Sequence, residues 1–125
     1  MKILFVIKSS TLYGSNMALL NLIDGLKEKI EPLVVYSTEG PFIDQLKEKK
    51  IPIAKLGRYS YQIYPSHKTF KGIITYLPRL FYLAYNHFVV NRLVRIAKRF
   101  KADLIHTNVG PVHIGYSAAE RLNIP

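Results

Sequence analysis

The sequence predicts an α/β protein, a Rossmann-like three-layer sandwich in which helices cover both faces of a parallel sheet. Short apolar runs alternate with longer amphipathic ones along the chain, which indicates a succession of β-α units. The first apolar run, from Ile3 to Ile7, is continuous, as is typical of a central strand covered on both sides. The chain has 125 residues, 49% of them hydrophobic, which suits one domain with a substantial core.

The first half of the chain contains three expected strands and two expected helices. The strands are expected at residues 2–7, 32–37 and 52–56, and the helices at residues 16–29 and 42–50. In the first helix the apolar side chains recur at helical spacing, at Met17, Leu20 and Ile23 among others. Ser15 or Asn16 is expected to cap it. A turn at residues 38–41 leads into the second helix.

The second half begins with a tyrosine-rich loop, residues 57–69, whose length is typical of functional or mobile loops. A long helix is expected to begin near Pro78, because proline is tolerated in a first turn, and to run to Phe100. A fourth strand at residues 102–107 and a last helix at 111–122 follow. The expected strand order is third, second, first, fourth, with right-handed crossovers.

The charge of the chain is strongly positive and unevenly distributed. The formal net charge is +10, and the stretch between Glu48 and Asp103 holds twelve Lys and Arg and no acidic residue. This bias favours an anionic partner such as nucleic acid, a phospholipid surface or a phosphorylated ligand. The alternative is a basic face that is merely solvated. The chain has no Cys, which excludes disulfides, thiolate metal sites and a Cys nucleophile.

The apolar start of the chain resembles a signal peptide only superficially. Its apolar run has five residues, Ile3 to Ile7, and no small-residue cleavage site follows it. Nowhere does the sequence reach the roughly 20 uninterrupted apolar residues of a spanning helix. We therefore expect a cytoplasmic protein, with peripheral contact at the inner membrane face as an open alternative.

Gly14, Ser15 and Asn16 are the first candidate site, for an acceptor or a phosphate. They lie where the first strand ends and the first helix begins, and a helix amino-terminus offers unpaired N–H groups and a partial positive charge. A glycine there lets a phosphate or sugar approach the backbone. The alternative is a plain strand-to-helix turn, since one glycine does not make a dinucleotide-binding motif.

His106, Asn108 and Gly110 are the second candidate site. They follow the fourth strand, and ligands of open α/β sheets bind at the carboxyl ends of the strands. Strand alternation places His106 and Asn108 on one side of the sheet and Thr107 on the other. For His106 the alternative is a buried, hydrogen-bonded histidine. Glu39 and Gly40 reach the same edge, but we interpret them as an ordinary turn.

A basic and aromatic segment within the long helix is the third candidate, for a membrane or another anionic surface. Its residues are Arg79, Tyr82, Tyr85, Arg92, Arg95, Lys98 and Arg99. In the alternative interpretation the helix has an ordinary core stripe and its cations only solvate the opposite face. That core stripe would consist of Leu77, Leu80, Ala84, Phe88 and Leu93.

Two parts of the sequence resemble the amino-terminal domain of glycosyltransferase family 4 and related GT-B enzymes. The first comprises the opening strand, the loop residues 13–16 and the helix residues 19–26, which read LLNLIDGL. The second comprises residues 102–108, ADLIHTN, and residues 118–122, AAERL. The motifs occur in the order and at the spacing of the family, and they cover nearly the whole chain.

The resemblance implies transfer of a sugar from a nucleotide-sugar donor to a sugar or lipid-linked acceptor, as in polysaccharide biosynthesis. It implies that residues 1–125 form a single acceptor-side domain, inactive alone, and that the donor-binding carboxy-terminal domain is absent. No cofactor or metal is implied, because the nucleotide-sugar is a substrate held mainly by that second domain. No residue of this chain is assigned a catalytic role.

The chain departs from the family at two positions. It has Gly14-Ser15 where the family often has two glycines, and Asn108 where the family often has a second histidine. Asn can hydrogen-bond a sugar hydroxyl but cannot exchange protons near neutral pH, so a histidine's role is not carried over. The rival hypothesis is a non-catalytic basic Rossmann-like module that binds nucleic acid or another anionic polymer.

Overall fold

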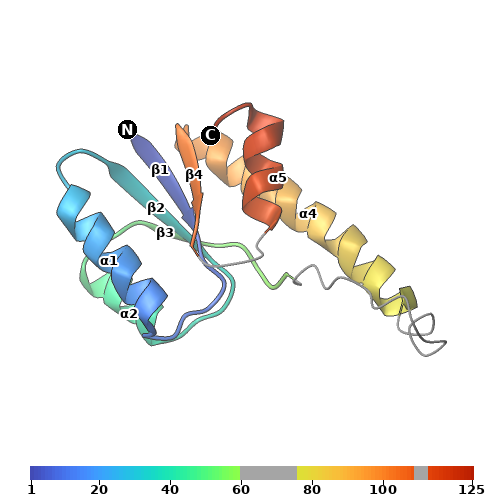
Figure 1. Cartoon of the computed structure of the whole chain (residues 1–125), viewed down its shortest axis with the longest axis horizontal. Coiled ribbons are helices and arrows are strands. Elements are labelled where there is room, and N and C mark those ends of the chain that lie inside the picture. Colours follow the sequence, from blue (N-terminus) through green and yellow to red (C-terminus); the bar gives the residue numbers. More distant parts are fainter. Residues whose placement is uncertain (60–75, 109–112) are drawn as a thin grey trace.

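The computed structural model describes residues 1–59, 76–108 and 113–125. The elements follow one another as alternating strands and helices (Figure 1). Their bounds are β1 Lys2–Val6, α1 Gly14–Leu26, β2 Glu31–Tyr36, α2 Pro41–Glu48, β3 Ile53–Lys55, α4 Tyr76–Phe100, β4 Leu104–Thr107 and α5 His113–Leu122. The four strands form one parallel sheet in the order β3-β2-β1-β4, so the predicted fold class and strand order are confirmed.

The strand β1 lies in the interior of the sheet, with a neighbouring strand along each edge, and its residues are apolar on both faces. It pairs in parallel with β2 and with β4, so that Phe5 lies opposite Val34 on one side and His106 on the other. Since all strands run the same way, their carboxyl ends meet at one edge of the sheet. We call this edge the rim; it consists of residues 7–15, 37–40 and 108, which follow β1, β2 and β4.

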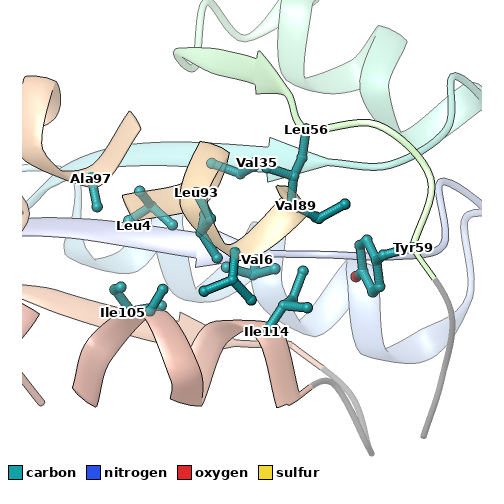
Figure 2. Packing of buried hydrophobic residues seen from close by; sticks show 12 residues of the cluster. Leu4, Val6, Val35, Leu56, Tyr59, Val89, Leu93, Ala97, Ile105 and Ile114 are labelled. Carbon is teal, nitrogen blue, oxygen red and sulfur yellow. The ribbon is translucent and has the colours of Figure 1, made fainter. Parts of the chain in front are cut away.

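Two helical layers cover the two faces of the sheet, and alternate residues of β1 point into each. Phe5 belongs to the cluster formed with α1 and α2. Leu4 and Val6 belong to the cluster formed with α4 and α5 (Figure 2). The second cluster includes Val35, Val89, Leu93, Ala97, Ile105 and Ile114. A continuous apolar strand is therefore required, because both of its faces are buried.

Element boundaries differ from the predicted ones by a few residues. The helix α1 begins at Gly14, and neither Ser15 nor Asn16 caps it: Tyr13 holds the cap position without a side-chain hydrogen bond. The helix α4 begins two residues before Pro78, which remains within the first turn that tolerates proline. Of the predicted loop, Tyr61 and Tyr64 lie outside the described residues.

The core stripe that the alternative interpretation placed on α4 is wrong in two of its positions. Ala84 is exposed, and Phe88 has 70% of its surface exposed. Leu93 is buried as that stripe requires, and the other buried residues among the described side chains of α4 are Val89, Val90 and Ala97. The physical reason is that, among the side chains of α4 that the structure describes, the buried ones begin at Val89, while the amino-terminal half of the helix extends past the sheet (Figure 1).

A search of the described residues for a helix both long enough and apolar enough to cross a bilayer finds none. The helix α4 is continuous, but arginines and lysines separate the apolar residues of its second half.

Candidate functional site

The loop that follows β1 is tied to the turn that follows β2. Ser10 is buried, and its hydroxyl donates a hydrogen bond of 2.7 Å to the Glu39 carbonyl. The Phe42 N–H donates to the Ser10 carbonyl at 2.9 Å. A Cβ at Gly40 would lie only 2.9 Å from that carbonyl oxygen, so this position needs glycine for space. The rim is therefore held together by backbone contacts from two loops.

Asn16, in the first turn of α1, organises the loop from the other side. Its side chain is 3% exposed, and Nδ2 donates to the carbonyls of Ser9 at 3.0 Å and Thr11 at 2.7 Å. A side chain that turns back onto the preceding loop cannot also cap its own helix, which explains why the expected cap does not form. Asn16 is thus a positioning residue for residues 9–15.

Asn108 joins the two candidate sites of the rim directly. Its backbone N–H donates to the Val6 carbonyl at 2.9 Å, which extends the β1–β4 pairing by one residue. Its side-chain Nδ2 donates to Asn16 Oδ1 at 3.1 Å and to the Ser15 carbonyl at 3.3 Å. Residues 92 positions apart in sequence therefore form one amide network. Gly110, the other predicted member, lies outside the described residues.

The surface beside this network is open. Gly14 and Ser15 are exposed, and apart from its chain neighbours and the backbone of α1, no atom of the described residues lies within 4 Å of the position that a Cβ at Gly14 would occupy. Leu12 and Tyr13 are also exposed, Tyr13 by 75%. Our sequence interpretation missed these two side chains; their signal was a pair of large apolar residues in a loop that should be polar. Together they offer an apolar platform next to polar amides, a common feature of ligand sites.

His106 is exposed, so its interpretation as a buried histidine is wrong. Its ring meets the ring of Phe5 edge to face, with the centroids 5.4 Å apart. Strand alternation is as expected, because Thr107 faces α5 on the opposite side of the sheet. The histidine is exposed because α1 and α2, the described helices on this face of the sheet, lie mainly over β1, β2 and β3 (Figure 1).

Glu39 forms a charged cluster at the same rim. Lys55 Nζ lies 3.0 Å from Glu39 Oε1, the Tyr36 hydroxyl donates to the same oxygen at 2.9 Å, and Lys47 Nζ lies 3.7 Å from Oε2. The Lys55 hydrogen bond, and then the Tyr36 hydrogen bond, lower the pKa of the Glu39 carboxyl. Because two lysines already neutralise this carboxylate, the interpretation of Glu39 as part of an ordinary turn fits its surroundings.

One further cation reaches the rim. Burial lowers the pKa of Lys8, whose Nζ lies 5.6 Å from the centroid of the Tyr59 ring. Within residues 1–59, 76–108 and 113–125, no three His, Asp or Glu side chains gather where they could hold a metal ion. The amides and hydroxyls of the rim residues described above therefore offer hydrogen bonding to a ligand.

The third predicted site lies on α4, away from this network. The members whose side chains are described are all exposed: Tyr85, Arg92, Arg95, Lys98 and Arg99. Arg79 and Tyr82 belong to the same helix, and their side chains lie outside the described residues.

Comparison with known proteins supports the fold through structure alone. No protein-family model and no curated protein sequence matches the chain. Solved structures do. HepE from Anabaena, in complex with UDP-glucose, is 21% identical with a TM-score of 0.66; the match covers all of this chain and 28% of HepE. MurG from Acinetobacter baumannii is 17% identical with a TM-score of 0.66, covering all of this chain and 33% of MurG.

A glycosyltransferase from Rickettsia africae is also similar, at 17% identity and a TM-score of 0.63, with 98% of this chain and 27% of that protein covered. The chain shares the fold of one part of each of these three proteins. It spans about a third or less of the length of these proteins. At these identities the likeness shows the fold alone, and it agrees with the Rossmann-like α/β domain that the sequence predicts.

Proposed function

We propose that this chain is the acceptor-side lobe of a glycosyltransferase, which moves a sugar from a nucleotide-sugar donor to an acceptor. The observation that carries the proposal is the amide network of Asn108, Asn16 and Ser15. It joins the loops after β1 and β4 at the rim of a sheet whose fold recurs in sugar transferases. HepE has been solved with UDP-glucose, and also with UDP and glucose, which supports a nucleotide-sugar as the donor class.

The rim residues have the chemistry that a sugar acceptor requires. Among the described residues no group donates to Asn108 Oδ1, so this oxygen can accept a hydrogen bond from a sugar hydroxyl. The exposed Tyr13 side chain can pack against the apolar face of a sugar ring, and Ser15 supplies a hydroxyl at the helix amino-terminus. We assign these residues to binding and positioning, because an amide such as that of Asn108 cannot transfer protons near neutral pH.

Charge development on the departing nucleotide diphosphate would be offset mainly by a second, donor-binding domain. The positive end of α1 at Gly14 would contribute from this side. In this proposal the chain alone does not turn over a nucleotide-sugar. The wider acceptor class, lipid-linked sugar or polysaccharide, is part of the same proposal and is supported by the basic surface described below.

An NMR titration of the 15N-labelled chain tests the assignment of the rim. Free glycans, a lipid-linked sugar and UDP-glucose are titrated separately, and the shifts of the Ser15 and Asn16 amides and the Asn108 side-chain amide are followed. We expect one acceptor class to shift these signals together, and Asn108→Ala to abolish the response without unfolding the chain. A response confined to other surfaces, or none to any sugar, would contradict the proposal.

A second measurement tests catalysis separately. UDP release from UDP-glucose is followed for the 125-residue chain with each acceptor. Our proposal expects no release above the uncatalysed rate, and steady turnover by this chain alone would show that no second domain is needed. Tight binding of single-stranded DNA at the rim, with a steep salt dependence, would favour the rival nucleic-acid module instead.

A further inference from the structure

One side of α4 carries an uninterrupted line of exposed aromatic and cationic side chains. Its members follow one another at spacings of four and three residues: Phe81, Tyr85, Phe88, Arg92, Arg95 and Arg99. At about 100° of rotation per residue, all six fall within about 40° of one line along the helix. We call this line the α4 stripe. Lys98 is exposed but lies well away from it.

The α4 stripe is divided into two chemically different halves. Phe81, Tyr85 and Phe88 are 80%, 48% and 70% exposed, and they precede Val89, the first buried residue of the helix among those described. The three arginines follow Val89, on the half that packs against the sheet. The aromatic half therefore extends from the body of the domain, and the cationic half lies along it (Figure 1).

Three exposed aromatic rings in a row are unusual for a solvated face, and they call for an apolar partner. The three arginines continue the same line, and their positive charges favour an anionic partner. We infer that the α4 stripe docks on an anionic phospholipid surface, with the aromatic half inserted among the headgroups and acyl chains. The arginines then bind the headgroup phosphates.

Two other partners fit the stripe less well. A second copy of this chain would bring the arginines of two stripes, and two net charges of +10, close together. Nucleic acid is bound by cations that follow the backbone and by aromatic rings that stack between them. Here the rings and the cations lie in separate halves of the α4 stripe. This separation suits a lipid interface, which is apolar among the acyl chains and anionic at the headgroups.

The direction of α4 gives the docked molecule a defined orientation. The helix ends at Phe100, just before β4 starts opposite Ile3, so its carboxyl end lies at the sheet edge opposite the rim. Its amino-terminal, aromatic half therefore extends on the rim side (Figure 1). Docking does not depend on the proposed sugar transfer, but if both hold, the rim faces the lipid surface from which a lipid-linked acceptor would come.

Co-sedimentation with vesicles of phosphatidylcholine and phosphatidylserine at about 0.15 M salt tests the inference. Two stripe variants separate its halves: Arg92→Gln with Arg95→Gln and Arg99→Gln, and Phe81→Gln with Phe88→Gln. The matched control removes three exposed cations from the other helical layer, with Lys27→Gln, Lys29→Gln and Lys50→Gln.

Each near-surface cation contributes about five-fold to binding, so the triple arginine variant should bind about 100-fold more weakly. The aromatic variant should also bind more weakly while keeping the salt dependence of the wild type. The control should lose clearly less than the triple arginine variant, and vesicles of phosphatidylcholine alone should bind the wild type poorly. Equal losses in the control and the arginine variant, or no binding by the wild type, would overturn the inference.

Tryptophan fluorescence distinguishes insertion from simple charge attraction, because the chain contains no Trp. We expect the emission of Phe88→Trp to shift to shorter wavelength on vesicles and to be quenched by brominated lipid. Leu22→Trp, on the exposed side of α1, should do neither. Tighter binding of single-stranded DNA than of vesicles, with the same stripe variants losing it, would assign the surface to nucleic acid. The NMR titration of the rim is independent of all these results.

Discussion

Gly115 lies where α5 crosses β4, and replacing it with alanine should destabilise the protein. A Cβ at this position would collide with Thr107 Oγ1 and would lie 3.5 Å from Thr107 Cβ and 3.7 Å from Ile105 Cγ2. Thr107 is β-branched and sits in a paired strand, so its side chain has few alternative rotamers. The helix can approach the strand this closely only because residue 115 has no side chain.

The expected cost follows from two opposing terms. Overpacking a tight contact costs about 1–3 kcal/mol, and alanine in a helix interior is favoured over glycine by about 1 kcal/mol. We therefore expect Gly115→Ala to lower the free energy of unfolding by up to about 2 kcal/mol. For a domain of this size the melting temperature would fall by about 3–6 °C per kcal/mol.

Urea unfolding followed by circular dichroism measures this change, with Gly25→Ala in α1 as the matched control. No atom lies within 4 Å of a Cβ at Gly25, so that variant should be more stable than wild type by up to about 1 kcal/mol. In a Thr107→Ala background, Gly115→Ala should lose most of its cost. If the two glycine variants changed stability alike, or the cost persisted without Thr107, the steric reasoning would be refuted.

Three further predictions concern the core, the rim loop and the charged cluster. Leu93→Ala should cost about 2–5 kcal/mol in urea unfolding because Leu93 is fully buried, whereas Phe88→Ala should change stability by less than about 0.5 kcal/mol; similar costs would contradict the packing of α4. Asn16→Ala should cost about 1–3 kcal/mol and broaden the NMR signals of residues 9–15, because two carbonyls lose this donor and the Asn108 amide loses one of its two acceptors; unchanged signals would argue against the network. The carboxyl of Glu39 has a lowered pKa through Lys55, so its stabilisation is present above the unfolded-state pKa and is lost as pH falls through the lower folded-state value. Glu39→Gln should therefore lower the urea midpoint at pH 6 and have a smaller effect at pH 3, and an effect independent of pH would contradict the ion pairing.

Most of the fold could be predicted from local sequence patterns. The continuous apolar run of β1 indicates a strand buried on both faces, and alternating β and α patterns restrict the connections to a parallel sheet. The same rules placed Gly14 and Asn108 at one edge, because parallel strands end together. That these loops share a hydrogen bond from Asn108 Nδ2 to Asn16 Oδ1 was not predictable, since it depends on a separation of 3.1 Å across 92 residues.

The errors have a common cause, which is that burial depends on what lies opposite a residue. The apolar positions of α4 gave no sign that Phe88 lies before the point where the helix meets the sheet and Val89 after it. His106 occupies a strand position that reads as buried, yet among the described residues α1 and α2 leave its side chain exposed. Asn16 suits a helix cap by residue type, but the loop carbonyls of Ser9 and Thr11 attract its amide instead.

By itself, the sequence determined the elements, their order in the sheet and the edge where polar loops gather. These depend on the period of the apolar residues and on chain connectivity, which are local properties. Only the tertiary structure decided which side chains are covered, that the two asparagines share one network, and that six exposed residues of α4 form a divided stripe. Such features depend on distances between elements, and these distances are set by packing of the whole domain rather than by any one segment.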